Sequence, residues 1–227
     1  MLQSPQGSLA VSSEIRCKLA DERRCQNMEI VLVSGLPRSG KTTFANRIED
    51  SGIGYTHVPL DKYILAVPDN YLFLDWVDKA ECIDWGGLND DLTVLSSGNS
   101  CLTPAPDWSN RGIRKERSVK AGSRFMPSPK TGVIIAGCHS IKGPFMRSLV
   151  KKVFIHAPLD VIAARLGGEA NEPKIVLDNN LSPDWRSIEK YQDYCDWIID
   201  GTESRQNQCQ CFMEIVGSNS ANRDILA

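Results

Sequence analysis

The sequence lacks a long hydrophobic run, and no stretch approaches the ~20 apolar residues that a membrane-spanning helix requires. The first ten residues show no basic stretch followed by an apolar block, so we expect no signal peptide. Neither sign of charge dominates, because 26 Lys and Arg stand against 28 Asp and Glu and leave a net charge of −2. This balance does not favour nucleic acids or anionic membranes as partners.

None of the eight cysteines belongs to a CxxC pair. Cys209 and Cys211 are close in sequence, but no histidine or second cysteine pair lies near them, which disfavours a zinc site. We interpret the cysteines as free, mostly buried thiols in a reducing compartment rather than as disulfides or metal ligands. The expected location is therefore cytoplasmic.

Apolar residues make up 41% of the 227 residues, which is enough for the core of one α/β domain with some additions. Apolar, β-rich runs alternate with helical patterns, and this alternation predicts a five-stranded, mostly parallel sheet flanked by helices. The expected strands are 28–34, 55–60, 132–137, 152–157 and 197–200. The expected helices are 42–50, 71–82, 88–97, 143–150, 159–166 and 183–194.

Three parts are expected along the chain. Residues 1–27 are an N-terminal extension, 28–201 form the main domain, and 202–227 are a C-terminal tail. The tail either adds one strand through 211–216 or forms no further element. Residues 96–129 are polar and rich in loops, a composition typical of an insertion that faces a substrate.

Residues 35–42 match the complete phosphate-binding pattern GxxxxGK[ST], and they follow a strand and open a helix. Glycines in such a loop let backbone N–H groups converge on phosphate oxygens. Lys41 places a charge on the β- and γ-phosphates, and Thr42 can ligate Mg²⁺. We therefore predict a three-layer P-loop NTPase fold that binds ATP. The predicted ATP-binding residues are Gly35, Leu36, Pro37, Arg38, Ser39, Gly40, Lys41, Thr42 and Thr43.

Asp61 follows the second predicted strand, at the carboxyl end where ligands of an open α/β sheet gather. A carboxylate there can take a proton from an attacking hydroxyl and orient Mg²⁺, although a solvated turn aspartate is the alternative. The sequence has no NKxD segment of the kind that reads a guanine base. The third strand ends at Ala136 and Gly137, without the acid typical of a transport or helicase ATPase.

Several segments occur in an order known from one family. They are Lys41-Thr42-Thr43, Asp61-Lys62-Tyr63, 83–87, 104–108 with Arg111, and 152–166. Over about residues 28–201 the sequence thus resembles the uridine kinase-like family of small-molecule P-loop kinases, which includes nucleoside, phosphoribulokinase-like and nicotinamide riboside kinase-like enzymes.

The resemblance implies that Asp61 is the catalytic base and also a metal ligand with Thr42. It implies that Arg165, together with Lys41, acts on the phosphates when a lid closes. The residues implied for the acceptor site are Asp84, Asp107, Trp108 and Arg111. Simpler alternatives are a helix cap for Asp84, a core position for Trp108 and a surface charge for Arg165.

The chain departs from the family pattern at three places. Ala136 occupies the position of a glutamate that helps to hold magnesium, and the lid segment 167–174 has Lys174 as its single basic residue. Arg38, or Arg111, Arg114 and Arg117 in the insertion, can compensate for the lid. Pro106 replaces a uracil-binding tyrosine, which argues against uridine as the acceptor. His139 follows the third strand, but Mg²⁺ prefers oxygen, so we assign it no metal role.

The predicted function is therefore an ATP-dependent, Mg²⁺-requiring transfer of phosphate to a hydroxyl of a small metabolite, either a nucleoside or a sugar-like alcohol. One alternative is a degenerate kinase that binds nucleotide as a regulatory module. The other is a P-loop NTPase that hydrolyses nucleotide. The expected partner is a small-molecule substrate, with no nucleic acid and no membrane. The oligomeric state stays open, a homodimer included.

Overall fold

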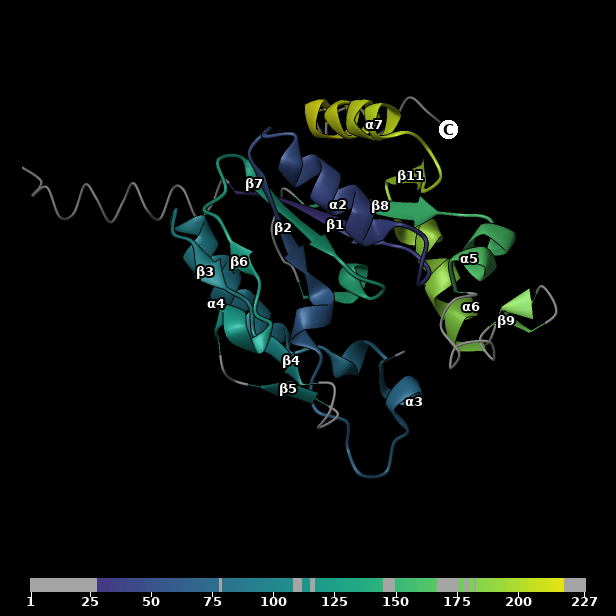
Figure 1. Cartoon of the computed structure of the whole chain (residues 1–227). Helices are drawn as coiled ribbons and strands as arrows, with labels where there is room; N and C mark the ends of the chain where they lie inside the picture. Colours follow the sequence, from purple (N-terminus) through teal and green to yellow (C-terminus); the bar gives the residue numbers. More distant parts are fainter. Residues whose placement is uncertain are drawn as a thin grey trace, which may run out of the picture.

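A five-stranded sheet forms the centre of the protein, which we describe from a computed structural model (Figure 1). The structure describes residues 28–77, 79–107, 112–114, 117–144, 150–166, 176–177, 180–181 and 183–218. The sheet has the order β11-β8-β1-β7-β2, and all four neighbouring pairs are parallel. Its strands are β1 (Glu29–Ser34), β2 (Tyr55–Pro59), β7 (Gly132–Ala136), β8 (Val150–His156) and β11 (Trp197–Asp200). All five coincide with predicted strands, which confirms the expected sheet.

The helices are α2 (Lys41–Asp50), α3 (Phe73–Val77), α4 (Trp85–Ser96), α5 (Leu159–Leu166), α6 (Pro183–Glu189) and α7 (Arg205–Gly217). Single 3₁₀ turns are η1 (Leu60–Tyr63), η2 (Ala80–Cys82), η4 (Val119–Ala121), η5 (Ser140–Lys142) and η6 (Lys190–Tyr194). Short strands are β3 (Cys101–Leu102), β4 (Ala105–Asp107), β5 (Gly112–Arg114), β6 (Phe125–Met126), β9 (Val176–Leu177) and β10 (Asn180–Leu181). None of the described helices is long and apolar enough to cross a membrane.

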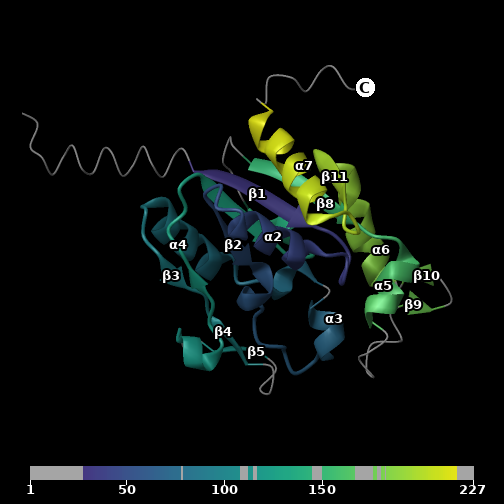
Figure 2. The same cartoon turned by 45° about the horizontal axis from the view of Figure 1, so that its top comes forward.

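The central strand β1 divides the core into two layers, because side chains alternate between the faces of a strand. Ile30 and Leu32 pack with residues of α4, whereas Val31 and Val33 pack with residues of α2 and α7. Figures 1 and 2 show α2 and α7 together on one face of the sheet. A third cluster joins Phe154 of β8 to α5, α6 and η6. The three-layer P-loop NTPase fold is thus present.

The tail does not add a strand. Residues 211–216 lie in α7, which begins where the Ser204 hydroxyl accepts a hydrogen bond from the Asn207 N–H. Buried Gln208, Phe212 and Ile215 follow at the spacing of one helix face, so the short apolar run 211–216 forms a helix and not the expected strand. Because α7 packs against the sheet, the folded unit extends to Gly217, beyond residue 201.

Two helix predictions also need correction. The expected helix 71–82 is divided into the short α3 and η2, with Lys79 between them in extended conformation. For the expected helix 143–150, Val150 begins β8, while residues 145–149 lie outside the described ranges. The N-terminal extension 1–27 also lies outside them.

The insertion forms a small lobe beside α4, which we define as residues 101–107, 112–114 and 117–126. Within it β3 pairs with β6 and β4 pairs with β5, both antiparallel. Figures 1 and 2 show this lobe at the side of the molecule opposite α5 and α6. Strand β4 contacts η1, the turn that follows β2, so the lobe reaches the carboxyl end of the sheet.

Candidate active site

The phosphate loop leaves β1 and turns sharply into α2. Gly35 has a φ of 146°, and a Cβ atom there would lie 2.4 Å from the carbonyl oxygen of Ile155 in β8. Gly40 has a φ of 110° and caps α2 in left-handed conformation. Only glycine allows this close approach and these angles without strain. The sequence motif therefore has the backbone shape that the phosphate-binding function needs.

Two further residues of the loop are held under constraint. Arg38 has a φ of 62°, a left-handed conformation that costs a non-glycine residue about 1–2 kcal/mol. Lys41 is only 8% exposed, and its Nζ donates to the Leu36 carbonyl oxygen at 2.6 Å. The ammonium group is therefore held at the mouth of the loop, where it can meet phosphate oxygens.

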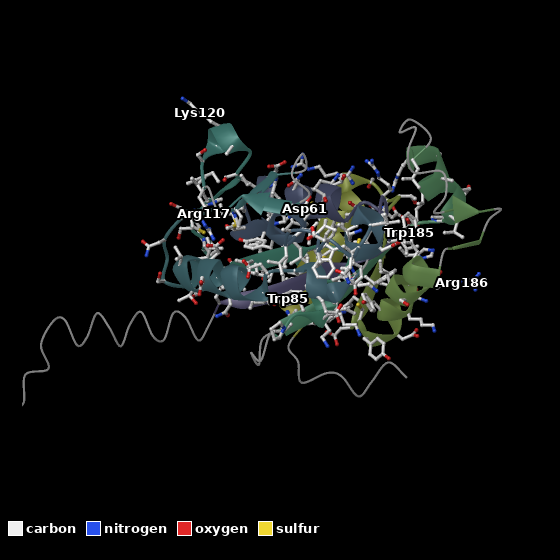
Figure 3. The ribbon with its side chains drawn as sticks, turned by 90° about the horizontal axis from the view of Figure 1, so that it is seen from below. Asp61, Trp85, Arg117, Lys120, Trp185 and Arg186 are labelled. Atoms are coloured by element: carbon white, nitrogen blue, oxygen red, sulfur yellow. The ribbon has the colours of Figure 1, made fainter. Side chains whose placement is uncertain are left out.

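Asp61 lies in η1, directly after the carboxyl end of β2. Solvent reaches its side chain, yet surrounding protein atoms desolvate the carboxylate, and this burial raises its pKa above the ordinary value. The positive charges of Lys62 and Lys41 partly offset that rise in pKa. Lys41 has the smallest of these effects, but it places the phosphate loop and Asp61, which are 20 residues apart in sequence, on the same side of the sheet domain. Figure 3 shows Asp61 near the middle of this end of the molecule.

Asp84 is the N-cap of α4, and its Oδ1 accepts a hydrogen bond from the Gly87 N–H at 2.9 Å. The simpler alternative of a helix cap is thus realised. Its own backbone N–H donates to the Tyr63 carbonyl oxygen at 2.7 Å, which keeps Asp84 next to η1. Its role toward an acceptor stays a prediction. The backbone of Asp107 is described in β4, but its side chain, Trp108 and Arg111 lie outside the described residues.

Arg165, in the last turn of α5, lies against the phosphate loop. Its Nη1 donates to the Arg38 carbonyl oxygen at 2.8 Å, and its Nη2 donates to the Gly201 carbonyl oxygen at 3.3 Å. The guanidinium group thus joins the loop to the turn after β11. A role on the phosphates stays a prediction, and the lid segment 167–174 lies outside the described residues.

The end of β7 is closed by apolar packing. Ala136 is 5% exposed, and a Cβ atom at Gly137 would lie 2.5 Å from the Leu60 Cβ. His139 is buried, and its Nε2 lies 3.2 Å from the Val77 carbonyl oxygen while Nδ1 lies 3.4 Å from the Tyr191 hydroxyl. Burial is the main cause that lowers the His139 pKa, so the ring is neutral near pH 7.

Oxygen ligands for a magnesium ion are few on the protein side. Thr42 has an exposed hydroxyl in the first turn of α2, and Asp61 offers a carboxylate. Within the described residues, no group of three or more His, Cys, Asp or Glu could hold a metal ion. This set fits Mg²⁺, which usually takes one or two protein oxygens and completes its shell with waters and substrate phosphates.

A buried polar network beside Asp61 escaped the sequence interpretation. The Asp91 carboxylate accepts hydrogen bonds from the Tyr63 hydroxyl and from Arg117. Arg117 is therefore paired with Asp91 in this structure, and its compensation for the lid stays a prediction. One signal was available: Asp91 occupies a core-facing position between Leu88 and Leu95 of the α4 pattern, where a carboxylate needs a partner.

Comparisons with known proteins point to the same kind of protein as the phosphate loop. No protein-family model matches the chain. Two curated relatives named uridine kinase, from Borrelia duttonii (strain Ly) and Borrelia recurrentis (strain A1), are each 26% identical over 184 residues. The match covers 76% of this chain and 86% of each relative.

Among solved structures, a possible uridine kinase from Bacillus stearothermophilus aligns with a TM-score of 0.46 and 15% identity. That alignment covers 82% of this chain and 98% of the other. D-glycerate 3-kinase from Cryptococcus neoformans var. grubii aligns with a TM-score of 0.42 and 17% identity, covering 78% and 83%. Since both TM-scores are below 0.5, the fold assignment rests on the sheet order and the phosphate loop described above. These features show a P-loop fold, and over most of its length the chain is similar to the two curated relatives named uridine kinase.

Proposed function

We propose that this protein is an ATP-dependent kinase that phosphorylates a hydroxyl group of a small metabolite, a nucleoside-like or sugar-like alcohol. One observation carries the proposal: Asp61 directly follows β2 and the complete phosphate loop directly follows β1, so both lie at the carboxyl edge of one parallel sheet. Phosphoryl transfer to an alcohol needs a group that accepts the hydroxyl proton beside a group that holds the phosphates. The curated relatives named uridine kinase support the same class of reaction.

In the proposed mechanism, Asp61 orients the acceptor hydroxyl and accepts its proton as the hydroxyl oxygen bonds to the γ-phosphorus of ATP. The bond between that phosphorus and the β–γ bridging oxygen breaks, and ADP leaves with the bridging oxygen. The raised pKa of Asp61 makes its carboxylate a better base for the hydroxyl proton. Lys41 and the N–H groups at the start of α2 bind the β- and γ-phosphates. Arg165 keeps the loop in place through the Arg38 carbonyl and adds positive charge nearby.

Magnesium would be held by Thr42 and Asp61, and it would neutralise charge on the transferring phosphate.

The thiols fit a reducing, cytoplasmic setting. The six described cysteines form no disulfide, and of these only Cys82 is fully buried. They are Cys82, Cys101, Cys138, Cys195, Cys209 and Cys211. The expectation of mostly buried thiols therefore holds only in part.

The direct test measures ADP formation against a panel of nucleosides, vitamins and sugar acids, with Asp61→Asn as the variant. We expect one acceptor class to stimulate turnover, and Asp61→Asn to lower kcat by about 10²–10⁴ while ATP still binds. An unchanged kcat in Asp61→Asn would show that the base is another residue. Fast turnover without any acceptor would instead identify a nucleotide hydrolase.

A degenerate, nucleotide-binding module is the second candidate, and two observations favour it. Ala136 supplies no side-chain oxygen for a metal at the end of β7. Arg165 donates to the backbone carbonyls of Arg38 and Gly201. Such a protein would bind ATP tightly and show no turnover with any acceptor in the panel. Isothermal titration with ATP and Mg²⁺, run beside the turnover assay, distinguishes it from the kinase.

A further inference from the structure

The Asp91 carboxylate is the centre of a buried hydrogen-bond chain. Asp91 is 4% exposed, and its Oδ2 accepts a hydrogen bond from the Tyr63 hydroxyl at 2.6 Å. Arg117 Nη1 lies 2.6 Å from Oδ1 and 2.8 Å from Oδ2 of the same carboxylate. A carboxylate this deeply buried is costly unless charged or strong donors compensate it, and here both oxygens are satisfied.

The chain begins two residues from Asp61, in the same single turn. Tyr63 and Asp61 both belong to η1, and the Tyr63 side chain has no exposed surface. A turn of four residues has few internal hydrogen bonds, so its orientation depends on what holds its ends. The Tyr63 ring packs in the core with α4, and its hydroxyl is fixed by Asp91 of that helix.

The chain ends in the small lobe. Arg117 Nη1 also donates to the Leu102 carbonyl oxygen in β3 at 2.5 Å, so the guanidinium ties Asp91 to two segments of the lobe. A second tie comes from the neighbour of Asp61, because Lys62 Nζ donates to the Gly122 carbonyl oxygen at 3.2 Å. In Figure 3, Arg117 and Lys120 of the lobe lie to one side of Asp61.

We propose that Tyr63, Asp91 and Arg117 are positioning residues through which the small lobe sets the orientation of Asp61. This inference rests on the proposed kinase function. The lobe contacts η1 directly through β4, and it is tied to η1 indirectly by the buried chain. An acceptor that binds against the lobe therefore changes the placement of the Asp61 carboxylate, which couples acceptor binding to the proton transfer.

The alternative is that the network only stabilises the lobe. The two explanations differ in what they leave unchanged. A stabilising network affects the melting temperature and leaves the kinetics of the folded enzyme alone. A positioning network affects kcat in the folded enzyme, because a misplacement of about 1 Å can cost about 10²-fold in rate.

The test compares Tyr63→Phe and Asp91→Asn with the wild-type chain at a temperature where all are folded. With the acceptor found in the turnover panel, we expect kcat to fall about tenfold or more in both variants, with the Kd for ATP unchanged. Arg117→Met should lower kcat, and Arg117→Lys should lower it less, since lysine keeps a positive charge next to the Asp91 carboxylate. Arg124→Met is the matched control, because Arg124 is another lobe arginine but pairs with Glu49 of α2.

A second readout does not require kinase activity. In protein labelled with ¹³C at the aspartate carboxyl carbons, the Asp61 signal is assigned through its loss in Asp61→Asn. We expect Tyr63→Phe and Asp91→Asn to shift this signal, while Arg124→Met leaves it in place. A signal that stays unchanged in Tyr63→Phe and Asp91→Asn, whether or not any acceptor is phosphorylated, would overturn the positioning role. A shifted signal without turnover would keep it and reject the kinase.

Discussion

His57 lies in β2 with no exposed surface, and its neutral form is built into the interior. Its Nδ1 donates to the Asn46 Oδ1 at 2.7 Å, while the buried Nε2 has no hydrogen-bond partner among the described residues. Burial, reinforced by the positive charge of Arg124, lowers the pKa of His57 to about 3. Protonation of the neutral ring therefore destabilises the folded state.

The pH dependence of stability follows from the sign of that shift. Below pH ~6.5 the unfolded chain binds a proton at His57 and the folded chain does not, so stability falls as the pH is lowered from 6.5 toward 3. The loss is at most about 1.4 kcal/mol per pH unit. We expect His57→Gln to flatten the wild-type slope of the unfolding free energy between pH 4.5 and 6.5, as measured with urea. Equal slopes in the two proteins would contradict the neutral, buried histidine.

Asp61 gives a second pH dependence, because the same cause, burial, shifts its pKa in the opposite direction. Its pKa is raised because the carboxylate is desolvated, and the base must be ionised to act. Activity is therefore present above the Asp61 pKa and lost as the pH falls through it. We expect the acid limb of the kcat/KM profile to lie above the ~3.9 of an ordinary aspartate. A profile that stays flat down to that pH would show that Asp61 is not the base.

At the scale of elements, α7 is held at its carboxyl end by a lysine from the sheet. Lys151 of β8 donates through Nζ to the carbonyl oxygens of Ile215 and Val216 at 2.8 and 2.9 Å. The same Nζ lies 2.7 Å from Glu29 Oε1. A cation at this end of a helix satisfies carbonyls that lack helical partners and opposes the negative end of the helix dipole.

Removing the Lys151 ammonium takes away the hydrogen-bond donor of those carbonyls and the positive charge next to the Glu29 carboxylate. We expect Lys151→Met to lower the unfolding free energy by about 1.5–3 kcal/mol, the range for hydrogen bonds to a charged group. Lys152→Met, one residue along the same strand, is the matched control and should cost less. Equal losses, measured by chemical denaturation, would mean that the contacts to α7 contribute little.

The elements differ in how far the sequence predicts them, and burial explains the difference. Strands β1 and β7 are continuous apolar runs because helices cover both of their faces, and such runs are visible without any tertiary contact. The run 211–216 is equally apolar but too short to show its period, and only packing on the sheet selects the helix.

The candidate site also has parts that the sequence predicts and parts that only the structure shows. The phosphate loop is a local pattern, so its residues and shape could be predicted. The bond from Tyr63 to Asp91 spans 28 residues, and that from Arg165 to Arg38 spans 127, so neither pairing can be seen in the sequence. The acceptor residues 107–111 depended on the resemblance, and the structure does not describe their side chains.

At the scale of the whole molecule, the two ends of the sheet domain meet at the phosphate loop. Gly201 follows β11, and a Cβ atom there would lie 2.1 Å from the Ser39 carbonyl oxygen. Its N–H donates to the His156 carbonyl oxygen at 2.6 Å, and its own carbonyl accepts from Arg165. The turn after the last strand is thus packed directly against the loop formed after the first.

A side chain at Gly201 should therefore act on nucleotide binding. We expect Gly201→Ala to weaken ATP binding about tenfold, because the backbone of the loop must move to relieve overpacking that typically costs about 1–3 kcal/mol. Gly217→Ala is the control, since a Cβ atom at Gly217 would meet nothing within 4 Å. Equal Kd values for a fluorescent ATP analogue in the two variants would contradict this coupling.

The contact at Gly201 also orders events during synthesis of the chain. The residues of the phosphate loop leave the ribosome early, but the backbone that packs against Ser39 arrives only with the turn after β11. A growing or truncated chain that ends before residue 201 carries the complete GxxxxGK[ST] motif. It still lacks the backbone that packs against the phosphate loop. We therefore expect ATP binding only once the chain has been made and folded through the turn after β11.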